Sequence, residues 1–400
     1  MKICIISSFY PPFYFGGERA VQREAESLAV RGNQVSLLTS SPSRHSYVEE
    51  INHVMVHRIA PFNIYPPFEF SGRRGLMKPL FHLLDMWNPF SAARLRKALQ
   101  GIEPDVVYIH NFKGLSSTVF NVVKSLGLPS VFSADDYSLI CPRANLLRSS
   151  GNLCVNPALL CRLYARTQRQ IFSKNKPDLV IANAQFILDK FKQAAFFSGI
   201  HSVKEVVGVE PIGKNTKKDY SIINILYVGG VNKHKGVQVL IKAVLNLNHA
   251  NVRLHIVGTG QDLNEIKALA GDDPRITFHG FISDDDLSSL RRNTNICVVP
   301  SIWFDMAQGV ICESFSFGIP VIGSRIGGIP EFIEEGNNGL LFEPGNYDEL
   351  KAILERLTIN TSELKKLEEG AINSSTKYDI AKHVNRLEEL FRRVISEYHD

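Results

Sequence analysis

Short apolar segments alternate with amphipathic helical segments along this chain, and this alternation constrains the fold more than any other feature. Strand–helix alternation of this kind is typical of a parallel sheet covered by helices on both faces, so we expect an α/β protein. The first half predicts these elements in chain order: strand 2–7, helix 18–31, strand 34–40, strand 105–110, helix 118–126, strand 130–133, strand 178–182 and helix 184–194.

The alternation stops in a polar segment, KNTKKDY at 214–220, and then starts again. The second series predicts strand 222–228, helix 237–245, strand 253–257, helix 263–269, strand 276–278, helix 285–291, strand 296–299, a helix from about 309 and strand 320–323. We therefore expect two doubly wound, Rossmann-like domains, 1–205 and 221–377, joined by a linker at 206–220 and facing a deep cleft. Apolar residues at helical spacing predict that a last helix, 378–400, crosses back and caps the first domain.

The junction VVPSIWFDMAQGVICESFSFGIP at 298–320 carries two acids, Asp305 in the expected loop and Glu313 in the expected helix. Open α/β sheets bind ligands at such strand–helix junctions. The amides of Gly309 and Val310 at the helix N-terminus suit a diphosphate, while the two carboxylates suit sugar and ribose hydroxyls. The pattern fits a nucleotide-sugar site, and spacing alone equally fits an ordinary strand–helix unit with two surface acids.

Several motifs in order along the chain carry a family resemblance. They are PPFYFGGERAV at 11–21, PDVVYIHN at 104–111, DDYSLICPR at 135–143, YVGGVNKHKG at 227–236, LHIVGTG at 254–260, ITFHGFIS at 276–283, and the junction above followed by GGIPEFIEEGNNGLLFEPGN. With these the chain resembles a GT-B glycosyltransferase of the large retaining family 4, the group 1 glycosyl transferases. The resemblance covers nearly the whole chain and is strongest over 225–344.

The resemblance implies roles for individual residues. Asp305 and Glu313 match the paired acids of the family's E-x7-E motif, which contact the donor sugar and the ribose. Lys235 matches the lysine that contacts the donor diphosphate. Glycines fill the loops expected to approach the donor: Gly16 and Gly17 after the first strand, and Gly230, Gly258 and Gly260 in the second domain. A plain turn is the competing explanation for the first pair.

Four departures from the family pattern bear on these roles. Asp305 replaces the usual Glu, and Gly230 replaces an arginine, which leaves Lys235 as the clear cation, with Lys233 or Arg325 as candidate substitutes. Asp135-Asp136-Tyr137 stands where relatives often have His-Asp-Tyr, and Ala307-Gln308 replaces Phe-Gly. His110, at the end of a strand beside the expected cleft, is our candidate for the missing catalytic histidine; a structural role is the alternative.

We therefore expect a retaining hexosyltransferase that moves a sugar from a UDP- or GDP-sugar to a glycan or lipid-linked glycan, as in cell-surface polysaccharide biosynthesis. No cofactor or metal is expected, because Lys235 and backbone amides can stabilise the leaving diphosphate. The triple Asp284–Asp286 is interpreted as a helix N-cap and dipole partner. The alternatives are a degenerate paralogue that binds a nucleotide-sugar or a protein without turnover, and another enzyme on the same fold, such as an epimerase or phosphorylase.

The basic residues are concentrated in the first half. Residues 1–205 hold 24 Lys and Arg against 14 Asp and Glu, a net charge of +10, and residues 206–400 hold 21 against 26, a net charge of −5. No acid occurs from 137 to 177, and Arg73, Arg74 and Lys78 lie among leucines and aromatics at 66–90. Such segments suit an anionic membrane surface; a solvated face with a packed helical arm is the alternative, and nucleic acid ranks last because no motif for it is seen.

No apolar run is long enough for a spanning helix, and the N-terminal strand breaks too early for a signal peptide, so we expect a cytoplasmic protein, peripheral on the membrane at most. The six cysteines divide into two groups. Cys4, Cys297 and Cys312 lie in apolar runs and are expected to be buried thiols. Cys141, Cys154 and Cys161 cluster without a CxxC pair, which leaves open a zinc site with an unseen ligand or a disulfide.

Overall fold

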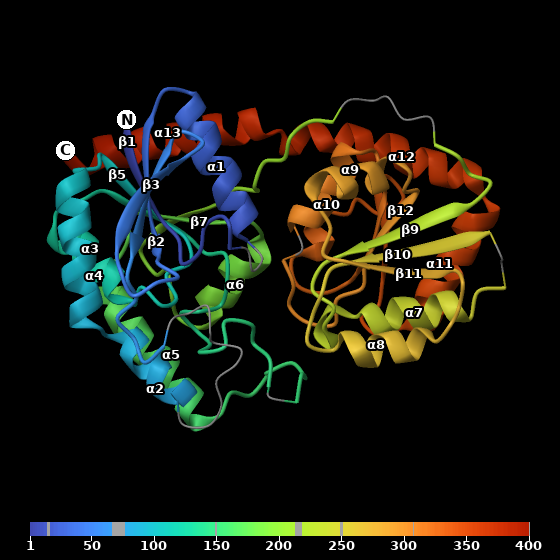
Figure 1. The fold of residues 1–400 in the computed structure, drawn as a ribbon, viewed down its shortest axis with the longest axis horizontal. Helices are drawn as coiled ribbons and strands as arrows, with labels where there is room; N and C mark the ends of the chain where they lie inside the picture. Colours follow the sequence, from blue (N-terminus) through green and yellow to red (C-terminus); the bar gives the residue numbers. More distant parts are fainter. Residues whose placement is uncertain are drawn as a thin grey trace. The chain divides into compact units, whose positions relative to one another are not determined.

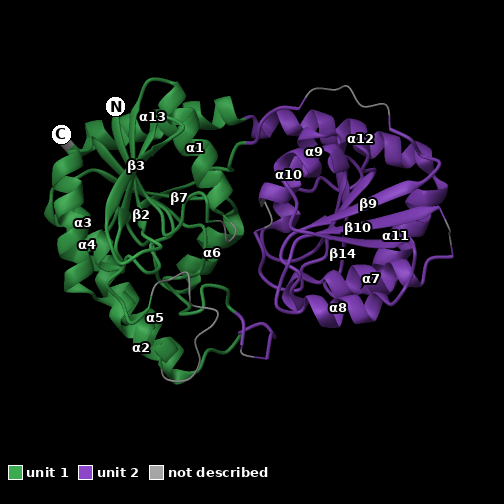
Figure 2. Cartoon of the chain, viewed as in Figure 1, with its two compact units in different colours: residues 1–146, 155–208, 380–400 green, residues 147–154, 209–379 purple. Residues whose placement is uncertain are grey.

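The computed structural model describes residues 1–13, 17–65, 77–148, 150–212, 218–248, 251–306 and 308–399, which form two units (Figure 1). The first unit comprises 1–146, 155–208 and 380–400, and the second comprises 147–154 and 209–379 (Figure 2). Each unit is built on a sheet with helices on both faces, so the predicted α/β class with two Rossmann-like sheets is confirmed.

The first unit contains an eight-stranded sheet in the order β3-β4-β2-β1-β5-β6-β7-β8, parallel except for the β3–β4 hairpin. Its elements are β1 (Lys2–Ile6), α1 (Glu18–Val30), β2 (Gln34–Ser40), β3 (Tyr47–Ile51), β4 (Val54–Ile59), α2 (Met77–Met86), α3 (Pro89–Ile102), β5 (Val106–Ile109), α4 (Thr118–Ser125), β6 (Ser130–Ser133), α5 (Leu159–Lys174), β7 (Leu179–Ala182), α6 (Gln185–Gln193), β8 (His201–Lys204) and α13 (Ile380–His399). The predicted strands and helices all occur, within one or two residues of the expected ends.

The second unit contains a six-stranded, all-parallel sheet in the order β11-β10-β9-β12-β13-β14. Its elements are β9 (Ile223–Val228), η2 (Lys233–Lys235), α7 (Val237–Leu245), β10 (Val252–Val257), α8 (Leu263–Ala270), β11 (Ile276–Gly280), α9 (Asp284–Arg292), β12 (Ile296–Val299), α10 (Gln308–Ser316), β13 (Val321–Ser324), η3 (Ile329–Glu331), β14 (Gly339–Phe342), α11 (Tyr347–Ile359), α12 (Thr361–Ser375) and η4 (Thr376–Tyr378). The predicted elements of this half are likewise present.

The last helix, α13, belongs to the first unit although it follows the second in the chain. Its apolar residues Ile380, Val384, Leu387, Phe391 and Val394 are buried in one core with residues of β1, β5 and α1. The five lie at intervals of three or four residues, which places them on one face of a helix. The periodicity that predicted the helix is therefore also what docks it.

The sequence did not predict the β3–β4 hairpin, β8 or β14. The hairpin turns at Asn52 and His53, which both have positive φ (48° and 66°), as a two-residue type I′ turn requires. Asn is favourable there, but the second residue is not the glycine that marks such turns in a sequence. The strand β8 (HSVK) carries too few apolar residues to stand out by composition.

The cysteine expectations have two outcomes. Cys4, Cys297 and Cys312 are buried thiols, as predicted, and burial raises the pKa of Cys297 to about 11. Cys141, Cys154 and Cys161 form no disulfide in the part of the chain that the structure describes, so the disulfide alternative is wrong. Within the described ranges, no three His, Cys, Asp or Glu side chains are grouped as metal ligands, and the zinc alternative therefore has no ligand set.

Candidate functional site

The chain changes direction at the centre of each sheet, and the predicted site residues follow the strands at these two points. In the second unit it runs outward from β9 to β10 and β11, then returns to place β12 on the other side of β9. In the first unit β1 and β5 flank the corresponding point. The loops after such a pair of strands diverge and leave room for a ligand, which makes these the expected binding positions in a doubly wound sheet.

Lys235 and Asp305 meet beyond the ends of β9 and β12, where the strand order of the second sheet reverses. We call this position the switch point of the sheet. Lys235 follows β9, Asp305 follows β12, and its Oδ2 lies 2.9 Å from Lys235 Nζ. Ser301 Oγ donates a second hydrogen bond to the same carboxylate oxygen, at 2.5 Å. The Asp305 side chain is 7% exposed and that of Lys235 28% exposed, so the acid is fixed while the ammonium group keeps contact with solvent.

Glycine backbone geometry fixes both partners of this ion pair. Gly236, directly after Lys235, has φ +75°, and a Cβ there would lie 1.7 Å from the carbonyl oxygen of Pro300. Gly327 has φ +63°, and its Cβ would lie 2.3 Å from the carbonyl oxygen of Asp305. The loops after β9, β12 and β13 therefore touch backbone to backbone, which only glycine permits.

Trp303 completes the surroundings of Lys235, and we did not identify it from the sequence. Lys235 Nζ lies 5.0 Å from the centroid of the indole ring, a cation–π distance. His234 makes an edge contact with the same ring, with centroids 5.2 Å apart. An aromatic residue two positions before the acid, in a loop after a buried strand, was the available signal.

Glu313 lies in the second turn of α10 and pairs with Arg291, the next-to-last residue of α9. The Arg291 side chain is 8% exposed, and its guanidinium carbon lies 5.6 Å from the Phe317 ring centroid. A buried guanidinium held in this way fixes the rotamer of the carboxylate. Sequence reasoning missed Arg291, because its partner is 22 residues away on another helix.

The glycines of the second unit divide into two groups. A Cβ at Gly258 would lie 2.0 Å from Gly229 O, and one at Gly260 would lie 2.3 Å from Val231 O. The backbone that these two approach is thus the adjacent loop. A Cβ at Gly230 would lie 2.8 Å from the Asn232 side chain and 3.9 Å from Thr259 O, and one at Gly309 would meet no described atom within 4 Å beyond its chain neighbours and its own helix backbone. Among the described residues, a Cβ at these two positions would not approach backbone as closely as one at Gly258 or Gly260.

Neither candidate substitute for the missing arginine joins Lys235. Lys233 pairs with Glu265 at 2.7 Å, and Arg325 pairs with Glu335 and Glu343 at 3.3 Å each. The aspartates at 284–286 form the first turn of α9, as expected of a dipole partner, but the N-cap is Ser283, whose Oγ accepts a hydrogen bond from the Asp286 amide.

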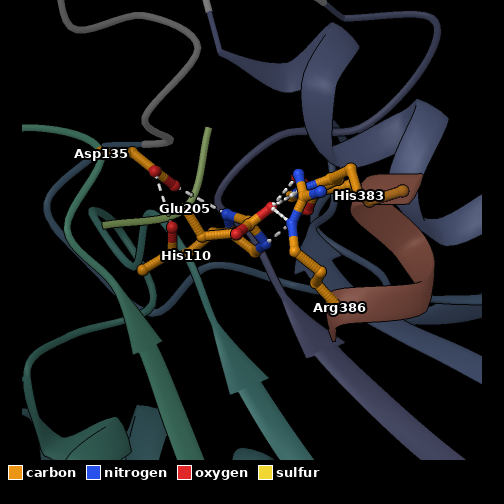
Figure 3. A network of polar contacts seen from close by, with 7 residues as sticks. His110, Asp135, Glu205, His383 and Arg386 are labelled. Carbon is orange, nitrogen blue, oxygen red and sulfur yellow. Dashed lines mark hydrogen bonds and ion pairs between the residues drawn. The ribbon is translucent and has the colours of Figure 1, made fainter. Parts of the chain in front are cut away.

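His110 follows β5 in the first unit and is buried between two carboxylates. Its Nδ1 lies 2.6 Å from Asp135 Oδ2, and its Nε2 lies 3.3 Å from Glu24 Oε2 (Figure 3). Burial alone would lower the pKa of His110, but the two carboxylates outweigh it and raise this pKa to about 10. The ring is therefore a cation at neutral pH, with both nitrogens occupied by acids.

Asp135 is the member of this group that reaches solvent. Its side chain is 26% exposed, against 4% for His110. Ser133 Oγ, at the end of β6, donates a hydrogen bond to Asp135 Oδ1 at 2.7 Å, and His110, which follows β5, contacts Oδ2. Both carboxylate oxygens are therefore oriented by a residue of the first unit. Relatives often have histidine at the position of Asp135. In this chain the position holds a carboxylate that pairs with the buried imidazolium of His110.

The loop after β1 lies close to the loop after β5. The Ser8 amide donates to Asn111 O at 2.7 Å and Ser8 Oγ to Asn111 Oδ1 at 2.9 Å. Gly17 precedes α1 with φ −76°, and a Cβ placed there would meet no described atom within 4 Å beyond its chain neighbours. Gly16, like Ala307, lies outside the described residues.

Comparison with known proteins agrees with this architecture. The family description "Glycosyl transferase 4-like domain" matches residues 15–198, and "Glycosyl transferases group 1" matches residues 223–360. An uncharacterised protein in the cps region of Klebsiella pneumoniae is 27% identical over 83% of this chain and 87% of its own length.

Two solved structures share the fold over nearly their whole length. Sucrose-phosphate synthase from Thermosynechococcus elongatus superposes with a TM-score of 0.76 at 16% identity, covering 99% of both chains. HepE of Anabaena, solved in complex with UDP-glucose, superposes with a TM-score of 0.72 at 18% identity, covering 98% of this chain and 99% of that one. The two family matches and the shared fold agree with the two sheets and with the residues at their switch points. This chain belongs to the group 1 glycosyltransferases of the GT-B fold.

Proposed function

We propose that this glycosyltransferase moves a sugar from a UDP- or GDP-sugar, with retention of anomeric configuration, to a glycan or lipid-linked glycan. The Lys235–Asp305 pair at the switch point of the second sheet carries the proposal, because it supplies one cation for a diphosphate and one fixed acceptor for sugar hydroxyls. The relative in the cps region and the UDP-glucose complex of HepE support a donor of this class and a role in cell-surface polysaccharide synthesis.

The diphosphate is bound by Lys235 and by the first turn of α10. Nζ of Lys235 remains partly exposed and can move from Asp305 to a phosphate oxygen when the donor binds. The amides of Gly309 and Val310 lie at the N-terminus of α10, where the helix dipole favours an anion. Glycine at 230 removes the guanidinium usual in the family, so a larger share of the phosphate charge falls on Lys235.

Asp305 and Glu313 bind the hydroxyl-bearing parts of the donor. Asp305, held by Ser301, accepts hydrogen bonds from the transferred sugar once Lys235 has moved to the phosphate. Glu313, held by Arg291, accepts them from the ribose. Both carboxylates are fixed by a partner before the donor arrives, which lowers the ordering cost of binding. Gly230, Gly258 and Gly260 shape the adjoining loops, as their backbone contacts indicate.

His110 acts in this proposal as a positioning residue. Its imidazolium, compensated by Glu24, holds Asp135 oriented at the carboxyl end of β6. Asp135 then accepts a hydrogen bond from a substrate hydroxyl on the first unit. Relatives often have histidine at position 135, and in this proposal the aspartate found there depends on His110 for its orientation.

In the reaction the bond between the anomeric carbon and the phosphate oxygen breaks, while the acceptor oxygen forms its bond on the same face of the sugar. The proton of the acceptor hydroxyl passes to the departing phosphate oxygen, so the step balances without a separate base. Lys235 and the α10 amides stabilise the charge that develops on the nucleoside diphosphate.

The test compares Lys235→Ala with Lys233→Ala. Both lysines lie in the 3-10 turn η2, but Lys233 pairs with Glu265 at the surface. Thermal unfolding with UDP, GDP, ADP, CDP and TDP first identifies the base, since a ligand at 100 times its Kd stabilises by about 2.7 kcal/mol. Transfer from the matching sugar nucleotide is then followed by proton NMR, which reports the anomeric configuration of the product.

We expect Lys235→Ala to lose the nucleotide-dependent stabilisation and about 10²- to 10³-fold of turnover, with Lys233→Ala close to wild type. Equal effects of the two substitutions would contradict the assignment of Lys235. Inverted product would overturn retention, and nucleotide binding without transfer to any acceptor would favour a binding paralogue.

A further inference from the structure

We propose that α2 and the first half of α5 form a surface that binds an anionic lipid bilayer. The apolar part of this lipid-facing patch consists of Leu80, Leu83 and Trp87 with Leu159, Leu160 and Leu163, and the basic part of Arg162 and Arg166. The inference concerns the first unit alone and does not depend on the reaction proposed above.

Large apolar side chains are exposed in the patch to an unusual degree. Leu159 and Leu160 are 73% and 77% exposed, Leu163 58%, Leu83 59% and Trp87 52%. Ten of the eighteen exposed large apolar side chains of the described residues fall in 77–90 and 155–163. Concentration of this kind, unlike scattered single residues, marks an interaction surface.

The two helices are neighbours. The rings of His82 on α2 and Tyr164 on α5 make an edge contact with centroids 6.5 Å apart. Their inner faces are satisfied within the unit, since Phe81 and Phe172 are buried and Tyr164 Oη donates to Ser138 O at 2.7 Å. The outward-facing leucines therefore do not pack in the core of the unit and can contact a partner.

The charge around the leucines selects the partner. The sequence from 137 to 177 contains seven Lys and Arg and no acid, and Arg162 and Arg166 are exposed between and beyond the leucines of α5. Arginine can reach lipid headgroups while its stem lies on apolar surface. Each basic residue near an anionic leaflet is attracted to it, and each leucine that enters the interface adds the gain from its buried area.

A second copy of this chain fits the patch less well. In a symmetric dimer the patch would face itself, which sets arginine against arginine without an acid from the same segment to compensate. No helix of the described residues is both long and apolar enough to cross a bilayer. The geometry therefore points to α2 and α5 lying in the plane of the membrane surface.

The experiment measures co-sedimentation of the full chain with phosphatidylcholine vesicles, with and without phosphatidylglycerol, at low and raised salt. One variant carries Leu159→Ser, Leu160→Ser and Leu163→Ser, and a second carries Arg162→Gln and Arg166→Gln. The matched control is Phe281→Ser with Ile359→Ser, two side chains of the second unit that are each 71% exposed. Because all of these positions are exposed, the fold should tolerate the changes.

We expect wild type and control to bind the anionic vesicles alike, the leucine variant to bind at least tenfold more weakly, and the arginine variant to lose its preference for phosphatidylglycerol. Trp87 locates the contact, since the chain has two tryptophans and the Trp303→Phe variant leaves only this one. Brominated lipids should quench its emission. Absence of wild-type binding, equal binding of all variants, an unquenched Trp87, or leucine-dependent self-association without vesicles would each overturn the proposal.

Discussion

The two units differ in how the charged side chains of their candidate sites are paired and buried. In the second unit Lys235 and Asp305 form one ion pair, and the lysine is partly exposed. In the first unit six charged groups from five segments form one network: Glu24 on α1, His110 after β5, Asp135 after β6, Glu205 after β8, and His383 and Arg386 on α13 (Figure 3). A ligand can exchange with the first arrangement, whereas the second is part of the fold.

Burial explains the difference. Glu24 and His383 are each 1% exposed, and Glu24 Oε1 lies 2.9 Å from His383 Nε2. Glu205 Oε1 lies 2.8 Å from His383 Nδ1 and 2.7 Å from Arg386. A buried charge that loses its partner cannot recover hydration, so such a network stabilises the position of α13 only while it is complete.

The largest expected effect comes from Glu24→Gln. This substitution leaves two buried imidazolium groups without their shared carboxylate, and we expect a loss on the order of 3 kcal/mol in the free energy of unfolding of the first unit. Urea unfolding in a Trp303→Phe background, followed through Trp87, reports that unit. Arg325→Ala, which breaks exposed pairs in the second unit, is the comparison; it is followed through Trp303 in a Trp87→Phe background and should cost below about 1 kcal/mol. Equal costs would remove the distinction between the two arrangements.

The next effect is a loss of stability in alkali. The carboxylates overcome burial and raise the pKa of His383 to about 9 and of His110 to about 10, from an ordinary 6.5. Their contribution is therefore complete below pH 6.5 and is lost as the pH rises through 9 and 10. On the acid side, the two histidines overcome burial and lower the pKa of Glu24 to about 2, so its contribution is lost as the pH falls from 4.5 toward 2.

Urea midpoints of the first unit, measured from pH 6 to pH 10, check this expectation. Glu24→Gln should flatten the alkaline decline, because the carboxylate that both histidines share is then absent. A decline of the same steepness in wild type and variant would mean that other groups cause it.

The smallest effect on stability is expected for Asp305→Asn. The amide keeps the shape and can still accept the Ser301 hydroxyl, and the exposed Lys235 can be solvated, so the cost should be about 1 kcal/mol or less. Transfer activity should nevertheless fall about 10²-fold. Unfolding and turnover measured on one preparation separate the two quantities, and a strongly destabilised variant would show that Asp305 is structural like Glu24.

The sequence located the site residues by their positions at strand ends but not their partners. Lys235 and Asp305 were recognised separately, and their ion pair joins positions 70 apart. Arg291 and Trp303 were missed, because a helix-terminal arginine and a loop aromatic have many ordinary roles. His110 was expected to replace a catalytic histidine, while its burial between Glu24 and Asp135 gives it the environment of a structural cation. No local pattern encodes that pairing, since Glu24 and His110 meet only through the order of the strands.

By itself the sequence determined the two strand–helix series, the family, and the helical face that docks α13. These follow from periodicity and from motifs of neighbouring residues, which are local properties of the chain. Only the tertiary structure decided which charges meet: Lys235 with Asp305, Glu313 with Arg291, and Glu24 with His383, 359 positions later. It also decided that the leucines of α2 and α5 lie outside the core. The physical reason is that burial and ion pairing depend on distances across the fold, which sheet order sets and local spacing does not.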